Sequence, residues 1–186
     1  MTIPISRIRN KVVDFVNIRS GSIILDVATG TGDQAIAFAR KDYSITGIDM
    51  SEDMLEIANK KNKDKSVKFK AADATNMPFR DKYFDVSCVS FGLHDMPFSV
   101  RKKVLKEMVR VTSLGGIIVI VDYALPRNKI WKYLVYHFVK SYESKYYPEF
   151  IKSDLKALLR KSKIEIIDEL RVFLGAIRIV KGTKLN

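Results

Sequence analysis

The chain of 186 residues has few of the residues from which disulfide-linked or thiolate-metal folds are made. It contains one cysteine, two histidines, one tryptophan and one glutamine. The single Cys88 excludes an intramolecular disulfide and a cysteine-cluster metal site, so we expect no bound metal. Cys88 falls inside an apolar segment of strand length, and we expect it to pack in the core.

Long hydrophobic runs are also absent. The longest strongly apolar run is Ile117–Val121, far shorter than the roughly 20 residues that a membrane-spanning helix needs. Arg7, Arg9, Lys11 and Asp14 interrupt the first apolar residues, so these contain no signal-peptide core. Together with the single cysteine, this predicts a cytoplasmic protein, with contact to a membrane surface left open. We find no internal repeat, and we expect one domain.

Positive charge is concentrated in the second half of the chain. Residues 1–100 hold 14 Lys and Arg against 13 Asp and Glu, whereas residues 101–186 hold 19 against 8. The balances are therefore +1 and +11, which add to the net charge of +12. A basic half could contact an anionic membrane surface, nucleic acid or an acidic substrate. Solubility or heat tolerance is an equally simple reason for it.

Short apolar segments alternate with amphipathic helical patterns over the first two thirds of the chain. Strands are predicted at 22–27, 44–48, 67–71, 84–89 and 117–121. Helices are predicted at 4–18 and 33–40, and two further helices are predicted to begin at residue 51 and at residue 97 or 98. Gly115-Gly116 is interpreted as a break before the last of these strands. The alternation predicts a Rossmann-like open sheet of the α/β class, mostly parallel, with helices on both faces. Ligands of such sheets bind beyond the carboxyl ends of the strands.

The last third is rich in aromatic residues, with nine of the 19 between Tyr123 and Phe150. A helical stripe follows Tyr123, and a second helix is predicted over 149–161. The stripe is either a lid over an apolar substrate or core packed on the sheet; it comprises Ile130, Trp131, Leu134, Val135, Phe138 and Tyr142. Residues 164–166 and 172–180 predict a closing strand pair with a turn near Gly175, which brings the sheet to seven strands with one antiparallel strand at its C-terminal end.

This gives a single domain of four parts. Residues 1–20 form an N-terminal helix, 21–122 a binding core, 123–162 a helical substrate lid and 163–186 the closing strands.

A glycine-rich turn after the first strand predicts a nucleoside site. Residues 30–35 match the pattern G-x-G-x-x-A, and Asp49 follows Gly32 by 17 positions. This pattern alone does not separate a dehydrogenase from an S-adenosylmethionine enzyme. Three features favour the latter: a helix before the first strand, Asp73 after the third strand, and a closing strand pair instead of a second βαβαβ half.

On several further segments the chain resembles the class I S-adenosylmethionine-dependent methyltransferases, and among them most the ubiquinone/menaquinone-biosynthesis C-methyltransferases. The segments cover roughly residues 20–125 in the family's order; they are Asp26–Asp33, Gly47–Leu55, Ala72–Phe79, Phe84-Asp85, Ser90–Leu93 and Glu107–Gly116.

The resemblance implies a cofactor, S-adenosylmethionine, and residues that hold it. Asp49 would accept hydrogen bonds from both ribose hydroxyls. Asp73 would accept one from the adenine amino group, aided by the Ala74 N–H, and Met50 would pack on the adenine ring. Ser90 would lie near the methionine end. The turn would line the methionine and ribose side; it contributes Asp26, Gly30, Thr31 and Gly32.

Candidate catalytic residues follow the fourth and fifth strands. His94 could act as a base, because imidazole titrates near neutrality, and Asp95 could orient it; an ordinary polar loop residue is the alternative. His94-Asp95 stand where the family usually has Arg-Asn. Asp122-Tyr123, where it tends to have Glu-Phe, is a second candidate.

The sequence therefore predicts a methyltransferase that acts on a small aromatic or quinol-like acceptor. Three alternatives stay open: an RNA or protein methyltransferase that uses the basic half, a non-catalytic S-adenosylmethionine-binding protein, and a dehydrogenase. Nucleic acid is disfavoured because the segment after the fourth strand lacks the Asn/Asp-Pro-Pro-aromatic run of amino-methylating nucleic-acid enzymes. Nothing in the sequence indicates an oligomeric state.

Overall fold

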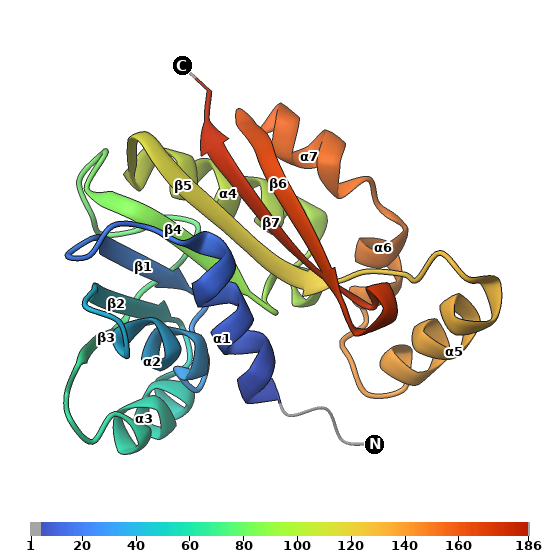
Figure 1. Ribbon diagram of the computed structural model, residues 1–186, viewed down its shortest axis with the longest axis horizontal. Coiled ribbons are helices and arrows are strands. Elements are labelled where there is room, and N and C mark those ends of the chain that lie inside the picture. Colours follow the sequence, from blue (N-terminus) through green and yellow to red (C-terminus); the bar gives the residue numbers. More distant parts are fainter. Residues whose placement is uncertain (1–4, 186) are drawn as a thin grey trace.

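One sheet runs through the molecule, with strand order β3-β2-β1-β4-β5-β7-β6 in the computed structural model, which describes residues 5–185 (Figure 1). The five strands from β1 to β5 are parallel, and β7 is antiparallel to both of its neighbours. The predicted mostly parallel sheet with an antiparallel C-terminal strand is confirmed. The strands are β1 Ile23–Val27, β2 Ser44–Asp49, β3 Val67–Ala71, β4 Phe84–Ser90, β5 Thr112–Tyr123, β6 Ile164–Val172 and β7 Ile177–Lys184.

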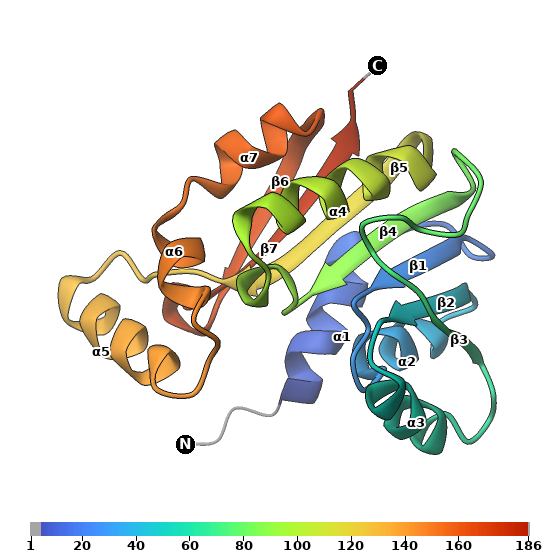
Figure 2. The same cartoon turned by 180° about the vertical axis from the view of Figure 1, so that it is seen from behind.

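Helices cover both faces of this sheet, as Figures 1 and 2 show from opposite sides. Helices α1 and α2 lie on one face, and α4 and α7 lie on the other. Two short 3-10 turns, η1 and η2, follow β4 and β6. The helices are α1 Ile5–Val16, α2 Asp33–Ala39, α3 Glu52–Lys61, α4 Phe98–Val111, α5 Lys129–Lys140, α6 Tyr147–Lys152 and α7 Leu155–Lys161; the turns are η1 Leu93–Asp95 and η2 Phe173–Gly175.

Each face of the sheet has its own core because successive side chains of a strand point to opposite sides. In β1, Ile24 belongs to the core beneath α1 and α2, whereas Leu25 belongs to the core beneath α4 and α7. Both are fully buried, which explains why the strand is a continuous apolar run. Burial of such a side chain contributes about 1.5–3 kcal/mol. Cys88 in β4 is also fully buried, as predicted.

The Gly115-Gly116 pair lies within β5 and does not precede it. Phe84 pairs with Thr112, but Val86 pairs with Ile117, so β5 bulges between these two pairs. Gly115 has a φ of 71°, and a Cβ on Gly116 would lie 2.8 Å from the Asp85 carbonyl oxygen. The glycines thus let the strand bulge without breaking.

Two other predicted boundaries are wrong. The helix expected over 149–161 is two helices, because Ser153 has extended backbone and the Asp154 side chain accepts a hydrogen bond from the Ala157 N–H at 3.0 Å, which starts α7. Strand β6 extends to Val172 instead of ending at 166, and η2 makes the turn expected near Gly175. The first helix ends at Val16, and Pro4 lies outside the described residues.

Helix α5 does not pack on the sheet, so the core alternative for the aromatic stripe is wrong. Figure 1 shows the helix projecting to the right of the sheet. Within α5 only Val139 is buried. None of the helices in residues 5–185 is both long enough and apolar enough to cross a bilayer.

The two glycines of the turn after β1 differ in the space around them, which gives a stability test. Both Gly30 and Gly32 have positive φ, so alanine at either position costs about 1–2 kcal/mol. A Cβ on Gly30 would meet no atom within 4 Å, whereas a Cβ on Gly32 would lie 2.6 Å from Phe69 Cζ and 2.9 Å from Ala58 Cβ. The overpacking adds about 1–3 kcal/mol. In urea unfolding without ligand, Gly32→Ala is therefore expected to be clearly less stable than Gly30→Ala; equal losses would contradict the packing argument.

Candidate functional site

The turn between β1 and α2 is fastened to the end of β2 through Asp49. Asp49 accepts hydrogen bonds from the Gly30 N–H at 2.8 Å and from the Ser51 N–H at 2.9 Å, one on each carboxylate oxygen. Each oxygen keeps a second lone pair. The carboxylate is thus held by the backbone in one orientation and can still accept two hydroxyl groups.

A cavity of about 400 Å³, here called the carboxylate cavity, opens beside Asp49. Four of the predicted cofactor residues lie together in its wall: Asp49, Met50, Asp73 and Ala74. Asp73 is positioned by Thr75, whose N–H and hydroxyl donate to its two oxygens at 2.7 and 2.9 Å. Met50 is 72% exposed, so its side chain is available to cover a flat ring.

Three buried polar atoms near the turn have no hydrogen-bond partner: Arg9 Nε, Asp26 Oδ1 and Gln34 Oε1. Burial raises the pKa of Asp26 to about 6, although a hydrogen bond from Thr29 and the charge of Arg9 act in the opposite direction. Buried polar groups are normally satisfied. These three atoms therefore have hydrogen-bonding capacity that the chain itself does not use.

Two predicted cofactor residues have other partners. The Thr31 hydroxyl donates to Asp33 at 3.1 Å and accepts from Lys61 Nζ at 3.0 Å, in an exposed cluster. Ser90 accepts a short hydrogen bond from Arg9, which also lies over the Phe91 ring at 5.2 Å. Ser90 therefore holds the arginine of α1 against the end of β4.

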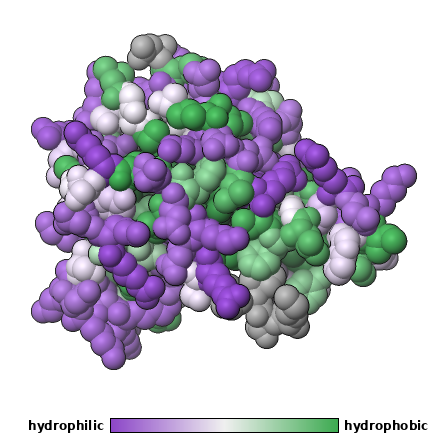
Figure 3. Space-filling view, in the orientation of Figure 1, coloured by the Kyte–Doolittle hydropathy of each residue, from purple (hydrophilic) through white to green (hydrophobic). Residues whose placement is uncertain are grey.

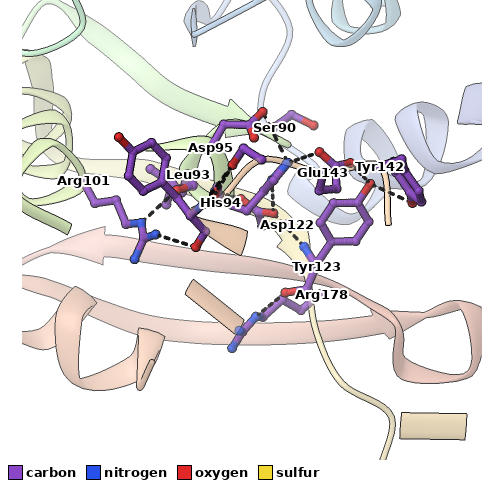
Figure 4. Close-up of polar contacts among 12 residues, drawn as sticks. Ser90, Leu93, His94, Asp95, Arg101, Asp122, Tyr123, Tyr142, Glu143 and Arg178 are labelled. Atoms are coloured by element: carbon purple, nitrogen blue, oxygen red, sulfur yellow. Dashed lines mark hydrogen bonds and ion pairs between the residues drawn. The ribbon is translucent and has the colours of Figure 1, made fainter. Parts of the chain in front are cut away.

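The predicted catalytic residues come together around the His94 ring (Figure 4). His94 is only 2% exposed, so it is not an ordinary surface loop residue. Its Nδ1 lies 2.7 Å from Asp122 Oδ1 and its Nε2 lies 3.1 Å from Glu143 Oε2. Asp122, and not Asp95, orients the ring, since Asp95 is 3.5 Å from Nε2 and half exposed.

Burial alone would lower the pKa of His94. The hydrogen bond and charge of Asp122, with the charges of Asp95 and Glu143, outweigh burial and raise the pKa to about 9. His94 is therefore an imidazolium at neutral pH, and both ring nitrogens donate. His94, Asp95 and Glu143 offer ligand atoms within 4.8 Å of one another, but a metal would first have to displace the imidazolium proton.

A second cavity of about 400 Å³ lies between α1, α5 and the loops at this edge of the sheet. We call it the aromatic cavity, because rings make up much of its wall; the ring residues are Phe91, Tyr123, Phe138, Tyr142 and Phe173. The Tyr123 hydroxyl donates to Glu143 Oε1 at 2.7 Å. Burial, followed by hydrogen bonds with Tyr142 and Glu143, raises the pKa of Tyr123, which therefore stays protonated.

The sequence interpretation missed three residues of this site, and the sequence carried a signal for two of them. Glu143 is the only acidic residue between Asp122 and Glu149, in a run rich in lysine and aromatic residues. Arg9 occupies a position in the inward stripe of α1, beside Ile8 and Val12.

Arg101 is the third, and no local pattern marked it. It is fully buried in α4, donates to the Leu93 carbonyl at 2.9 Å and pairs with Glu149 at 3.3 Å, which holds η1 and α6 together.

Comparison with known proteins decides the family. The model of the ubiE/COQ5 methyltransferase family matches residues 2–168, nearly nine tenths of the chain. The chain belongs to the ubiE/COQ5 methyltransferase family.

Two curated relatives of this ubiE/COQ5 chain are named demethylmenaquinone methyltransferase. The Thermotoga maritima protein is 41% identical over 132 residues, which are 70% of this chain and 56% of that protein. The Paenarthrobacter aurescens protein is 38% identical over 128 residues, which are 69% of this chain and 49% of that protein. The chain spans about half the length of the curated relatives it matches.

A solved structure supports the fold of this family member. A SAM-dependent methyltransferase from Aquifex aeolicus superimposes with a TM-score of 0.74 at 20% identity, over 95% of this chain and 89% of that one. This likeness shows the class I methyltransferase architecture, and at this identity it shows the fold alone.

The raised pKa of His94 predicts a dependence of stability on pH. The stabilisation by protonated His94 is complete below its ordinary pKa of 6.5 and is lost as the pH rises through about 9. The shift corresponds to about 3 kcal/mol. The free energy of unfolding should therefore fall by up to that amount between pH 6.5 and 9, measured by urea titration. His94→Asn should flatten this slope, and His137→Asn, at the only other histidine, should keep it. A slope unchanged in His94→Asn would refute the assignment.

The buried Asp26 predicts a conflict between stability and binding. Because its pKa is raised to about 6, ionised Asp26 destabilises the ligand-free fold above that pH. Asp26→Asn should raise the free energy of unfolding at pH 7 by about 1–3 kcal/mol. The same change should weaken S-adenosylmethionine binding at least about tenfold, because a charge-assisted hydrogen bond is lost. Thermal unfolding and calorimetry measure the two effects, and a variant both less stable and unimpaired in binding would contradict the argument.

Proposed function

We propose that the protein transfers a methyl group from S-adenosylmethionine to a ring carbon of a small quinol-like acceptor. The observation that supports this best is the pair of cavities at adjacent strand ends. Ala28, after β1, lines the carboxylate cavity, and Phe91, after β4, lines the aromatic cavity. Strands β1 and β4 are neighbours in the sheet, with Val27 opposite Val89. A donor site that contains two carboxylates thus lies beside an aromatic acceptor site.

The residues of the carboxylate cavity fit the cofactor. Asp49 would accept the ribose hydroxyls, Asp73 and the Ala74 N–H would contact the adenine edge, and Met50 would cover its face. Asp26 and Arg9 would hold the amino-acid end, where their unpartnered atoms lie. Bound there, the cofactor supplies a methyl group on a positively charged sulfur. The protein contributes alignment of the two reactants, which can lower the barrier by several kcal/mol.

The aromatic cavity would take the acceptor. Its wall is mostly apolar, but the Tyr123 and Tyr142 hydroxyls lie 3.5 Å apart and can meet an acceptor hydroxyl. Residues 123–162 would act as a lid, since α5 supplies one wall of this cavity. A quinol with an apolar tail fits such a site, and the names of the curated relatives support a quinol of the menaquinone type.

Glu143 is better placed than His94 to receive the proton of the acceptor hydroxyl. His94 already donates through both ring nitrogens, whereas Glu143 accepts from the Tyr123 hydroxyl that faces the cavity. The acceptor hydroxyl would donate to the Tyr123 oxygen as Tyr123 passes its own proton to Glu143. Loss of this proton makes the ring carbon nucleophilic. The methylated carbon then releases its hydrogen to solvent as a proton, which restores the aromatic ring, and the proton held on Glu143 returns to the acceptor oxygen through Tyr123. His94 is then a positioning residue that holds Glu143.

The test is methyl transfer from labelled cofactor to a water-soluble, short-chain demethylquinol. Glu143→Gln should lower kcat by about 10²–10⁴-fold, because it removes the proton acceptor, and should leave the cofactor Kd unchanged. Glu165→Gln, on an exposed part of β6, is the matched control and should retain full activity.

RNA and a mixture of proteins serve as competing acceptors in the same assay. If RNA or protein is labelled and no quinol is methylated, the result would favour an RNA or protein methyltransferase that uses the basic second half of the chain. Cofactor binding without any product from a broad panel of acceptors would favour a binding protein.

A further inference from the structure

Helix α5 carries an apolar face that nothing in the described chain covers. Ile130 is 71% exposed and Phe138 is 70% exposed, and Trp131, Tyr133, Leu134 and Tyr142 are also exposed. Figure 3 shows apolar side chains among hydrophilic ones over this projecting helix, at the right of the molecule. Exposed apolar area of this kind marks a binding surface.

The arrangement of these side chains follows the helical repeat. Ile130, Leu134 and Phe138 are spaced by four residues and therefore share one side of the helix, with Trp131 beside them. Val139 points the other way, into a small core with Tyr147 and Ile151. The helix is thus held to the body by one side and presents the other to solvent.

Cations surround this face. The segment from 124 to 148 contains five of them: Arg127, Lys129, Lys132, Lys140 and Lys145. All five are exposed, and within residues 5–185 none forms an ion pair with a carboxylate. The only acid of the segment, Glu143, is turned inward to His94 and Tyr123. The surface is both apolar and positively charged.

A groove of about 590 Å³ lies between α5 and α6, on the side of α5 away from the apolar face. Lysines at 129, 132 and 152 and two tyrosines, Tyr133 and Tyr136, line it. Ammonium groups and phenol hydroxyls together suit a phosphate group. Helix α5 is therefore apolar on one side and has an anion-binding element on the other.

We propose that α5 docks on an anionic lipid bilayer, with its apolar face among the acyl chains and its lysines at the phosphate groups. Interfacial helices with Trp and aliphatic residues on one side and Lys on the other bind in this way. The aromatic cavity is lined by Val135, Phe138, Val139 and Tyr142 of the same segment, so a docked molecule would place this cavity at the membrane. This role for the surface rests on the proposed lipophilic acceptor.

The charge distribution favours a bilayer over a second copy of this chain. A symmetric dimer through α5 would bring the five cations of one copy close to the five of the other, without acids to compensate them. An anionic bilayer offers the opposite charge over its whole area.

The only tryptophan of the chain, Trp131, reports directly on this surface. The full chain is titrated with vesicles of phosphatidylglycerol and phosphatidylcholine in equal parts, and its fluorescence is recorded. Docking predicts a blue shift of the emission and quenching by brominated acyl chains, both weakened by salt. Vesicles of phosphatidylcholine alone should give a much smaller change.

Two variants that keep Trp131 test the apolar and basic parts separately. Ile130→Ser with Leu134→Ser should lower the vesicle partition coefficient at least about tenfold, because two exposed aliphatic side chains are removed. Lys129→Glu with Lys132→Glu should lower it at least as much. Matched changes on α3 and the loop after it, Met54→Ser with Ile57→Ser and Lys63→Glu with Lys65→Glu, should leave it unchanged.

The inference is overturned if anionic vesicles leave the Trp131 emission unchanged, or if the α3 variants lose as much binding as the α5 variants. A blue shift that grows with protein concentration without lipid, with a dimer in sedimentation, would assign the face to a second copy. Activity on the water-soluble quinol separates the two proposals. The Ile130→Ser/Leu134→Ser protein should methylate it normally, and docking without any methyl transfer would refute the proposed function alone.

Discussion

His94 and its two carboxylate partners, Asp122 and Glu143, join three parts of the chain that are distant in sequence. Asp122, at the end of β5, is fully buried and accepts hydrogen bonds from the His94 ring, the His94 N–H and the Tyr123 N–H. On its other side the ring reaches Glu143, beyond α5. A buried charge of this kind is tolerated only when it is paired. The positions of η1, the end of β5 and the lid segment therefore depend on one imidazolium between two carboxylates.

The part of the site that follows from local sequence was predictable. Asp49 ends β2 and Asp73 lies two residues beyond β3. Because the carboxyl ends of parallel strands meet at one edge, both could be placed in one cavity from the sequence. Ser51 and Asp154 act through hydrogen bonds within four residues of themselves. The helix predicted from 51 does start at its N-cap Ser51, whereas the start of α7 at its N-cap Asp154 was missed because it falls inside a continuous apolar pattern.

The rest depends on contacts between distant segments. Whether Gly115-Gly116 breaks a strand or bulges is decided by the backbone of β4, 30 residues earlier in the chain. The role of His94 changes from base to imidazolium mainly because Asp122 holds its Nδ1, with Glu143 at its Nε2, and no spacing rule connects position 94 with 122 or 143. Arg101 looks like one more cation of a basic helix, yet it is among the most buried side chains. Such residues are defined by tertiary packing, which overrides their local pattern.

Strand β7 has the last place in the chain but an inner place in the sheet. It lies between β5 and β6, and Lys181 within it donates to the Val16 carbonyl at the end of α1 at 2.7 Å. During synthesis, the first five strands leave the ribosome well before residues 177–184. Until then the edge of β5 lacks its partner, and the helix that carries Arg9 lacks this tether. A nascent chain therefore carries an open β5 edge from the time that β5 emerges until β7 follows it, the kind of surface on which chaperones act.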